Sequence, residues 1–216
     1  MTAAGTADGL ETRALACAAG YRTLFASLDL RIDPGNWTML VGANGSGKTT
    51  LLRTIAGLAR PIAGEILWHG APRRVDDAEW RAQSVYQGHA SGWKDAFDVR
   101  ENLSMQLALD GLRVSPDTID AAIERVGLAR QSKLPFARLS AGQRRRVSLA
   151  RLSCSQGRAL WLIDEPGTAL DVDGLQLLGA LIDTHLHEGG LALVATHQAL
   201  PCAETPSRLS LDDLRQ

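Results

Sequence analysis

Apolar residues alternate with polar ones early in the chain. Between Leu24 and Ile32 every second residue is apolar, a pattern that predicts a strand with one buried face. The turn sequence Asp-Pro-Gly at positions 33–35 predicts the end of that strand. We expect the early strands to pair antiparallel.

A strand, a loop and a helix follow directly. Residues 37–41 are mainly apolar and predict a buried strand, and residues 42–49 are rich in glycine. The apolar spacing of residues 50–58 is helical, and Gly57 and Pro61 help to end that helix.

The rest of the chain alternates between helical spacing and short apolar runs. We expect short strands at 65–69 and 82–86, helices at 99–110, 116–126, 141–154 and 175–186, and buried strands at 160–163 and 191–195. Strands that are apolar on both faces and alternate with helices indicate a parallel sheet covered on both sides. The predicted fold is therefore α/β, with a mainly parallel core sheet, an antiparallel β region before it and a helical insert after the early strands.

The composition is that of an ordinary globular chain. Hydrophobic residues make up 45% and charged residues 22% of the 216 residues, which excludes disordered, collagen-like and disulfide-stapled classes. Without a long Pro/Gly/Ser linker, we expect one domain spanning residues 1–216. The formal net charge of -1 lacks the positive excess of many nucleic-acid binders, so we expect no nucleic-acid partner.

The cysteines and the apolar runs indicate in which cellular compartment we expect the protein. Cys17, Cys154 and Cys202 are far apart and form no CxxC pair, which argues against a disulfide framework, a zinc site and covalent haem attachment. A reducing compartment is the simplest interpretation. The start of the chain fits no secretory signal, and no apolar run approaches the length of about 18 residues that a membrane span needs.

Residues 42–49 read Gly-Ala-Asn-Gly-Ser-Gly-Lys-Thr, a complete phosphate-loop motif between a strand and a helix. The glycines let the backbone curl so that several N–H groups point inward, and the helix start adds the positive end of its dipole. Lys48 supplies a charge for the β and γ phosphates. The alternative is a chance glycine-rich turn, which the flanking strand and helix disfavour. We expect the nucleotide to be bound by Gly42, Ala43, Asn44, Gly45, Ser46, Gly47, Lys48, Thr49 and Thr50.

Two acids follow the apolar run at 159–163. Asp164 could hold magnesium together with the Thr49 hydroxyl, and Glu165 could polarise the attacking water as general base. Two acids after a strand could instead cap the next helix. Because Lys48 is present in the same chain, we favour the catalytic interpretation, although the phosphate loop alone does not separate kinases, GTPases and ATPases.

The segment Leu-Ser-Ala-Gly-Gln at 139–143 has two interpretations. Ser140 and Gln143 have capping-box spacing, so the segment could simply begin a basic helix. A helix start with small residues and free N–H groups is also an anion site. In this order the segment resembles the signature of the ATP-binding cassette (ABC) superfamily. We expect a mainly solvated face for the arginines that follow, Arg144, Arg145, Arg146 and Arg151.

The resemblance to ABC ATPases extends over nearly the whole chain. A glutamine follows a strand at Gln87, Thr168–Asp171 resembles the D-loop after the acid pair, and His197 ends a later strand as the switch histidine does. The resemblance implies a P-loop NTPase core with an N-terminal antiparallel β subdomain and a helical subdomain at approximately residues 88–155.

In ABC ATPases two copies enclose two ATP molecules, so the resemblance implies a homodimer with ATP and Mg2+ as cofactors. Ser140 and Gly142, with Gln143 beside them, would contact the γ-phosphate bound by the opposite subunit. Gln87 would sense magnesium and the lytic water, and His197 would hydrogen-bond the γ-phosphate. Plainer interpretations are a structural histidine and a solvated loop glutamine.

Several other side chains have weaker assignments. ABC ATPases commonly stack adenine on an aromatic residue ahead of the phosphate loop, near Ala19 here, with Tyr21 close by. We expect structural roles for the cysteines and for His69, His185 and His187, because no metal constellation surrounds them.

Several segments carry a narrower resemblance, namely 22–30, 34–37, 47–72, 86–94, 139–152 and 196–201. They are similar to the cytochrome c biogenesis ATP-binding export proteins, the ATPase subunits of haem exporters. That family usually has an apolar residue where Gln87 stands, before Gly88 and His89, so His89 is an alternative occupant of the sensing role.

This resemblance implies a peripheral subunit on the cytoplasmic face of the inner membrane, docked to the integral membrane subunits of a haem exporter. ATP hydrolysis would drive haem export or release the haem-loaded periplasmic chaperone, which is then an indirect partner. We expect residues 87–101 to transmit the change to a membrane helix. Two other functions compete: the ATPase of another importer or exporter, and a non-membrane ABC protein acting on DNA or ribosomes, against which the short single cassette argues.

Overall fold

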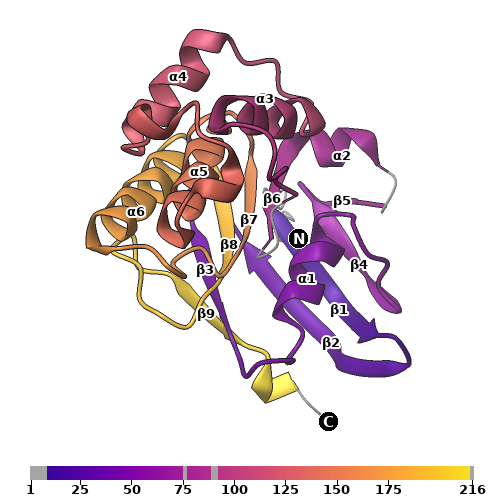
Figure 1. The fold of residues 1–216 in the computed structure, drawn as a ribbon. Coiled ribbons are helices and arrows are strands. Elements are labelled where there is room, and N and C mark those ends of the chain that lie inside the picture. Colours follow the sequence, from indigo (N-terminus) through magenta and orange to yellow (C-terminus); the bar gives the residue numbers. More distant parts are fainter. Residues whose placement is uncertain (1–8, 75–76, 89–91, 215–216) are drawn as a thin grey trace.

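The computed structural model describes residues 9–74, 77–88 and 92–214, which form two β-sheets and a layer of helices (Figure 1). The first sheet is antiparallel and has the strand order β2-β1-β4-β5. Its strands are β1 (Leu10–Ala19), β2 (Arg22–Ile32), β4 (Ala63–Trp68) and β5 (Ala71–Pro72). The antiparallel region expected ahead of the core sheet is confirmed.

The second sheet is parallel throughout and has the order β6-β7-β8-β3-β9. Its strands are β3 (Trp37–Val41), β6 (Ser84–Gln87), β7 (Leu160–Asp164), β8 (Leu191–Ala195) and β9 (Ser207–Ser210). Along β7 the side chains point alternately to the two faces, so that Leu160 and Leu162 pack in one core and Trp161 and Ile163 in the other. Both faces are covered, which explains why β7 and β8 are buried at every residue and read as apolar runs.

Helix α1 (Lys48–Ile55) fills the space between the two sheets. Leu51, Leu52 and Ile55 are fully buried in one core with residues of β1, β2, β7 and β8. The other face of the parallel sheet belongs to a core that also includes residues of helices α3 (Val99–Leu109), α4 (Pro116–Arg125), α5 (Ala141–Ser153) and α6 (Val172–His187). Helices α3, α4 and α5 pack against one another. The assignment of residues 88–155 to a separate helical subdomain stays a prediction.

The strand predicted at 82–86 is wrong in its first half. Residues up to Gln83 belong to helix α2 (Ala78–Gln83), and the strand starts at Ser84. Asp77 caps α2, and the buried indole of Trp80 donates a hydrogen bond to the carbonyl of Ile55 at 2.8 Å. A contact with the end of α1 therefore fixes this helix, which the local pattern did not reveal.

Strands β1, β5 and β9 are absent from the prediction, and in β1 the reason is visible. Its pairing with β2 shifts register between Thr12 and Ala18, and Ala14 has a φ of 45°. In β2, Ser27 has a φ of 59°, and Phe25 rather than Leu24 shares the buried face with Leu28. These bulges interrupt the alternation of buried and exposed positions.

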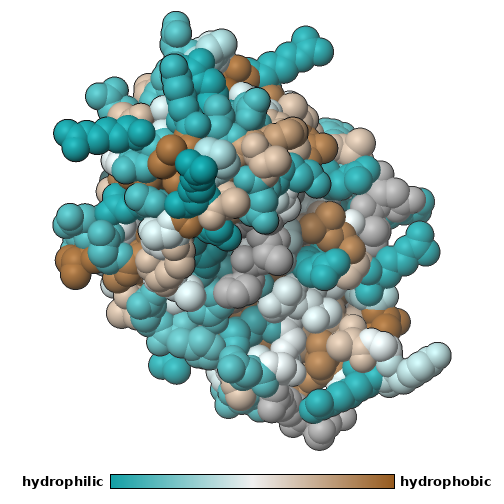
Figure 2. All heavy atoms as spheres, viewed as in Figure 1, coloured by the Kyte–Doolittle hydropathy of each residue, from teal (hydrophilic) through white to brown (hydrophobic). Residues whose placement is uncertain are grey.

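The length of the helices and the hydropathy of the surface show how the described chain could interact with a membrane. Helices long and apolar enough to cross a bilayer are lacking in the part of the chain that the structure describes. The face shown in Figure 2 is mainly hydrophilic, with apolar residues in small separate groups. On this face, apolar surface that could contact a partner is therefore limited to these small groups.

Candidate functional site

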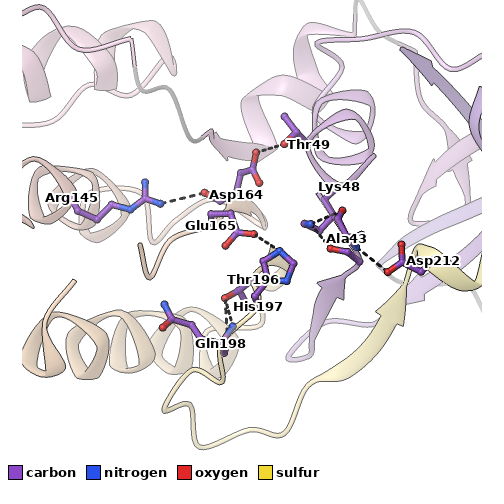
Figure 3. Close-up of polar contacts among 11 residues, drawn as sticks. Ala43, Lys48, Thr49, Arg145, Asp164, Glu165, Thr196, His197, Gln198 and Asp212 are labelled. Carbon is purple, nitrogen blue, oxygen red and sulfur yellow. Dashed lines mark hydrogen bonds and ion pairs between the residues drawn. The ribbon is translucent and has the colours of Figure 1, made fainter. Parts of the chain in front are cut away.

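The site lies at the carboxyl edge of the parallel sheet, where such sheets bind ligands (Figure 3). The glycine-rich loop follows β3, Glu165 follows β7, and Thr196 and His197 follow β8. Segments far apart in the sequence therefore meet at this edge.

The loop between β3 and α1 needs its glycines. Gly42 and Gly47 have φ values of 151° and 110°. A Cβ atom at Gly42 would lie 2.7 Å from Ser46 Oγ, and one at Gly47 would lie 3.1 Å from the ring of Phe25. Helix α1 has no side-chain cap at Gly47, so its first N–H groups are available to an anion.

Lys48 folds back across this loop. Its side chain is almost fully buried, and Nζ donates to the carbonyls of Gly42 at 2.6 Å and Ala43 at 3.3 Å. The loop thus holds an ammonium group beside the free N–H groups of α1. Such an arrangement attracts phosphate.

A cavity of about 340 Å³ lies over the loop. The described residues that line it are Ala19, Leu24, Asn44, Gly45, Ser46, Gly47, Lys48, Thr49, Thr50, Asp164 and Glu165. Seven residues of the predicted nucleotide set line the cavity, together with both acids of the predicted pair.

Thr49 and Asp164, the two oxygen ligands predicted for magnesium, are in contact. The Thr49 hydroxyl donates to Asp164 Oδ2 at 2.7 Å (Figure 3). A hydroxyl and a carboxylate oxygen are ligands that Mg2+ prefers, so this donor set fits the ion.

Gln87 ends β6 next to β7, where its backbone pairs with Ile163. It is 1% exposed, and both amide atoms of its side chain lack a hydrogen-bond partner among the described residues. The interpretation of Gln87 as a solvated loop residue is wrong. Its alternative for the sensing role, His89, lies outside the described residues.

Glu165 and His197 are brought together. His197 Nε2 lies 3.3 Å from Glu165 Oε1, and the imidazole is half exposed while the carboxylate is largely covered. The backbone N–H of Glu165 donates to the carbonyl of Ala195 at 2.8 Å. The predicted base and the predicted γ-phosphate contact therefore share one edge of the site (Figure 3).

Two contacts of the site were missed by sequence reasoning. Arg145 donates from Nε to the carbonyl of Pro166 at 2.9 Å, and Asp212 Oδ2 accepts the N–H of Ala43 at 2.9 Å. Arg145 is buried, as is Arg151, which binds Asp110, so the expectation of a solvated face is wrong for both arginines. The fully buried Leu149 and Leu152 follow Arg145 at helical spacing. This apolar pattern could have indicated that Arg145 lies on the buried face of the helix.

The signature segment lies outside the cavity. Ser140 Oγ accepts the N–H of Gln143 at 3.2 Å, and Gln143 Oε1 accepts the N–H of Ser140 at 2.9 Å. The capping box is therefore present, and Ser140 is exposed. Neither these residues nor Gly142 are among the described residues that line the cavity.

Several weaker candidates are also separate from the cavity. Tyr21 is fully exposed at the turn between β1 and β2, whereas Ala19 and Leu24 line the cavity. His185 is buried and stacks on Trp161 with ring centroids 4.1 Å apart, and burial lowers its pKa to about 4. Groups of three or more metal-binding side chains are lacking within the described ranges.

Comparisons with known proteins cover most of the chain. The family model described as ABC transporter matches residues 25–168. A cytochrome c biogenesis ATP-binding export protein CcmA of Pseudomonas aeruginosa is 46% identical over 191 residues, which are 88% of this chain and 94% of that protein. A CcmA protein of Salmonella paratyphi A is 46% identical over 204 residues, 94% of this chain and 96% of that protein.

Solved structures agree with the fold. An ABC transporter ATP-binding protein from Pyrococcus furiosus has a similar structure with a TM-score of 0.78 at 25% identity, covering 97% of this chain and 100% of that chain. The fold class predicted from the sequence is confirmed.

Proposed function

The chain belongs to the ABC transporter family and, within it, to the cytochrome c biogenesis ATP-binding export proteins, and from this premise we propose that it is the ATP-hydrolysing subunit of a membrane complex that serves cytochrome c maturation. The observation that carries this proposal is the assembly at one sheet edge of Lys48, the Thr49–Asp164 pair and the Glu165–His197 pair. Together they supply a phosphate site, an ion site and a base.

We propose the following roles in hydrolysis. The triphosphate of ATP lies against Lys48 and the start of α1. Thr49 and Asp164 would hold magnesium, which would supply positive charge to offset that of the phosphates. Glu165 takes a proton from water, the water oxygen bonds to the γ-phosphorus, and the bond to the β–γ bridging oxygen breaks to release ADP and phosphate. His197, held by Glu165, donates to a γ-phosphate oxygen.

A second copy of the chain completes the site in this proposal. Ser140, Gly142 and Gln143 are not among the described residues that line the cavity of their own chain, and Ser140 is exposed at the start of α5. A homodimer in which each α5 start faces the neighbour's cavity would bring free N–H groups and the hydroxyl to the γ-phosphate. Two ATP molecules would then be bound between two subunits.

The membrane partner is proposed to dock close to Gln87. A cavity of about 500 Å³ lies between the end of α1, helix α2, strand β6 and the end of α3. Leu109 in its wall is 75% exposed and Leu58 is 49% exposed, while Tyr86 in the same wall directly precedes Gln87. This wall would suit an apolar face on a cytoplasmic segment of the membrane subunit. Residues 87–101 would transmit a movement of that segment to the ATP site.

We propose a peripheral location on the cytoplasmic face of the inner membrane, with integral subunits of a haem exporter as partners. ATP hydrolysis is then coupled to haem export or to release of the haem-loaded periplasmic chaperone. Relatives named CcmA support this proposal through their name and their 46% identity.

A gene replacement tests the cellular role. Cells whose chromosomal copy carries Glu165→Gln should lose covalent haem staining of c-type cytochromes, and the wild-type copy should restore it. Detergent co-purification with mass spectrometry should recover haem-handling membrane proteins. Normal cytochromes in the mutant, or recovery of a different permease, ribosomal proteins or DNA, would contradict the proposal.

A further inference from the structure

Arg145 is a buried cation that the proposed hydrolysis does not use. It lies on α5 and is 8% exposed. Its Nε donates to the carbonyl of Pro166 at 2.9 Å, and a terminal nitrogen donates to the carbonyl of Asp164 at 3.5 Å. Burial lowers the pKa of this guanidinium, while the carboxylates of Asp164 and Glu165 raise it. Moving this charged group out of water costs free energy, and the two carbonyls are hydrogen-bond partners of the buried guanidinium.

Those two carbonyls flank Glu165 in the sequence. Glu165 itself has a φ of 49°, a left-handed conformation that a residue with a side chain adopts only when its surroundings enforce it. On the other side, the N–H of Glu165 donates to the carbonyl of Ala195 in β8. The backbone around Glu165 is thus held from α5 by Arg145 and from β8 by Ala195.

The planar guanidinium suits this task. Its N–H groups form a rigid fork, so that one side chain can bind the carbonyl before Glu165 and a carbonyl after it. A lysine ammonium on a flexible stem would not fix the two carbonyls relative to each other. Because a displacement of about 1 Å can cost a factor of about 100 in rate, the position of this backbone matters for a base.

We propose that Arg145 is a positioning residue that holds Glu165 in the geometry needed to activate water. This inference rests on the proposed function, since it depends on Glu165 acting as the base. Ser140 begins the same helix, so the arginine also connects the segment proposed to face the neighbour's ATP with the base of its own chain. Movement of α5 on dimer closure would reach Glu165 through this side chain.

The test compares single-turnover ATP hydrolysis and fluorescent-nucleotide binding in wild-type protein, Arg145→Met, Glu165→Gln and the double variant. We expect Arg145→Met to lower the rate about 10- to 100-fold while nucleotide affinity changes less than about 2-fold. In the Glu165→Gln background the same substitution should lower the remaining rate less than about 2-fold, because the base that Arg145 positions is gone.

A matched control separates positioning from a general loss of stability. Arg158 is also 8% exposed and also donates to a carbonyl, that of Asp110. Arg158→Met should lower the melting temperature and keep the wild-type rate. Arg145→Lys, which keeps the charge, should give a rate between those of the wild type and Arg145→Met, and it decides the question if the methionine variant does not fold.

The proposal fails under three results. The first is a wild-type rate in Arg145→Met or Arg145→Lys. The second is an equal loss with and without Glu165, and the third is an equal loss in Arg158→Met. If the wild-type protein itself does not hydrolyse ATP, the proposed function fails, which is a distinct outcome.

Discussion

The phosphate-loop cavity and the start of α5 differ in how complete they are within one chain. In the cavity, polar groups from the loop after β3, from α1 and from β7 already contact one another, as in the Thr49–Asp164 hydrogen bond. At the start of α5, the side chains of Ser140 and Gln143 each accept a hydrogen bond from the other residue's backbone N–H, and Ser140 faces solvent.

This difference separates two functions. A preassembled cavity binds its ligand at little cost in ordering side chains. An exposed helix start gains a partner only when another surface approaches it. We therefore expect a single chain to bind ATP and a pair of chains to hydrolyse it.

The largest expected effect comes from removing the proposed base. Glu165→Gln should lower ATP hydrolysis about 1,000-fold, within the range of general base contributions, and should retain ATP in a stable dimer that light scattering detects. Glu188→Gln, which removes an exposed acid after α6, is the control and should hydrolyse ATP normally. Unchanged turnover in Glu165→Gln would remove Glu165 from this role.

Removing the loop ammonium should act on binding instead. Lys48→Ala should weaken ATP binding roughly 10- to 100-fold, since a hydrogen bond to a charged group contributes about 1.5–3 kcal/mol. Titration with a fluorescent nucleotide measures this affinity, and exposed Arg53→Ala on the same helix should bind as the wild type does. Equal affinity in both variants would contradict the phosphate-loop assignment.

A substitution at the start of α5 should leave single-chain binding intact. Ser140→Asp keeps a capping side chain but sets a negative charge toward the neighbour's γ-phosphate, so hydrolysis should fall about 10-fold or more with unchanged melting temperature. Ser115→Ala, which removes the cap of α4, is the converse control: it should lose about 1 kcal/mol of stability and keep its rate. Normal hydrolysis by Ser140→Asp would show that the helix start does not meet ATP.

The smallest effect is expected at Asp212, whose carboxylate accepts the N–H of Ala43. Asp212→Ala should raise the KM for ATP about 2- to 10-fold, the range expected for one hydrogen bond, without changing kcat. Asp212→Asn keeps an acceptor oxygen and should restore part of the loss, and exposed Asp213→Ala should have no effect. A lower kcat at unchanged KM would contradict a role in shaping the loop.

The sequence predicted the strands best where both faces of the sheet are buried. Strands β3 and β8 have the predicted bounds, because both faces of the parallel sheet are covered and all their residues but Thr38 are apolar. β1 was missed because its bulges break the alternation, and α2 because Trp80 fixes it through a contact with α1. In each missed case a tertiary contact or an irregular backbone overrides the local pattern.

The site shows the same division. The phosphate loop is continuous in sequence, so its residue types and spacing reveal it. Arg145 and Asp212 act through backbone groups 21 and 169 residues away, and a contact with a carbonyl or N–H leaves no mark on the partner's residue type. The roles of Gln87 and His197 stay predictions, as does the role of Ser140, which the Ser140→Asp variant tests.

Helix α1 is enclosed by both sheets, and the loop that precedes it forms the floor of the cavity. A ligand that restrains this helix at its first turn should slow amide hydrogen exchange in both layers, including strands that never touch the nucleotide. Unfolding of the antiparallel sheet and of the parallel sheet should then remain one cooperative transition that shifts with ATP concentration.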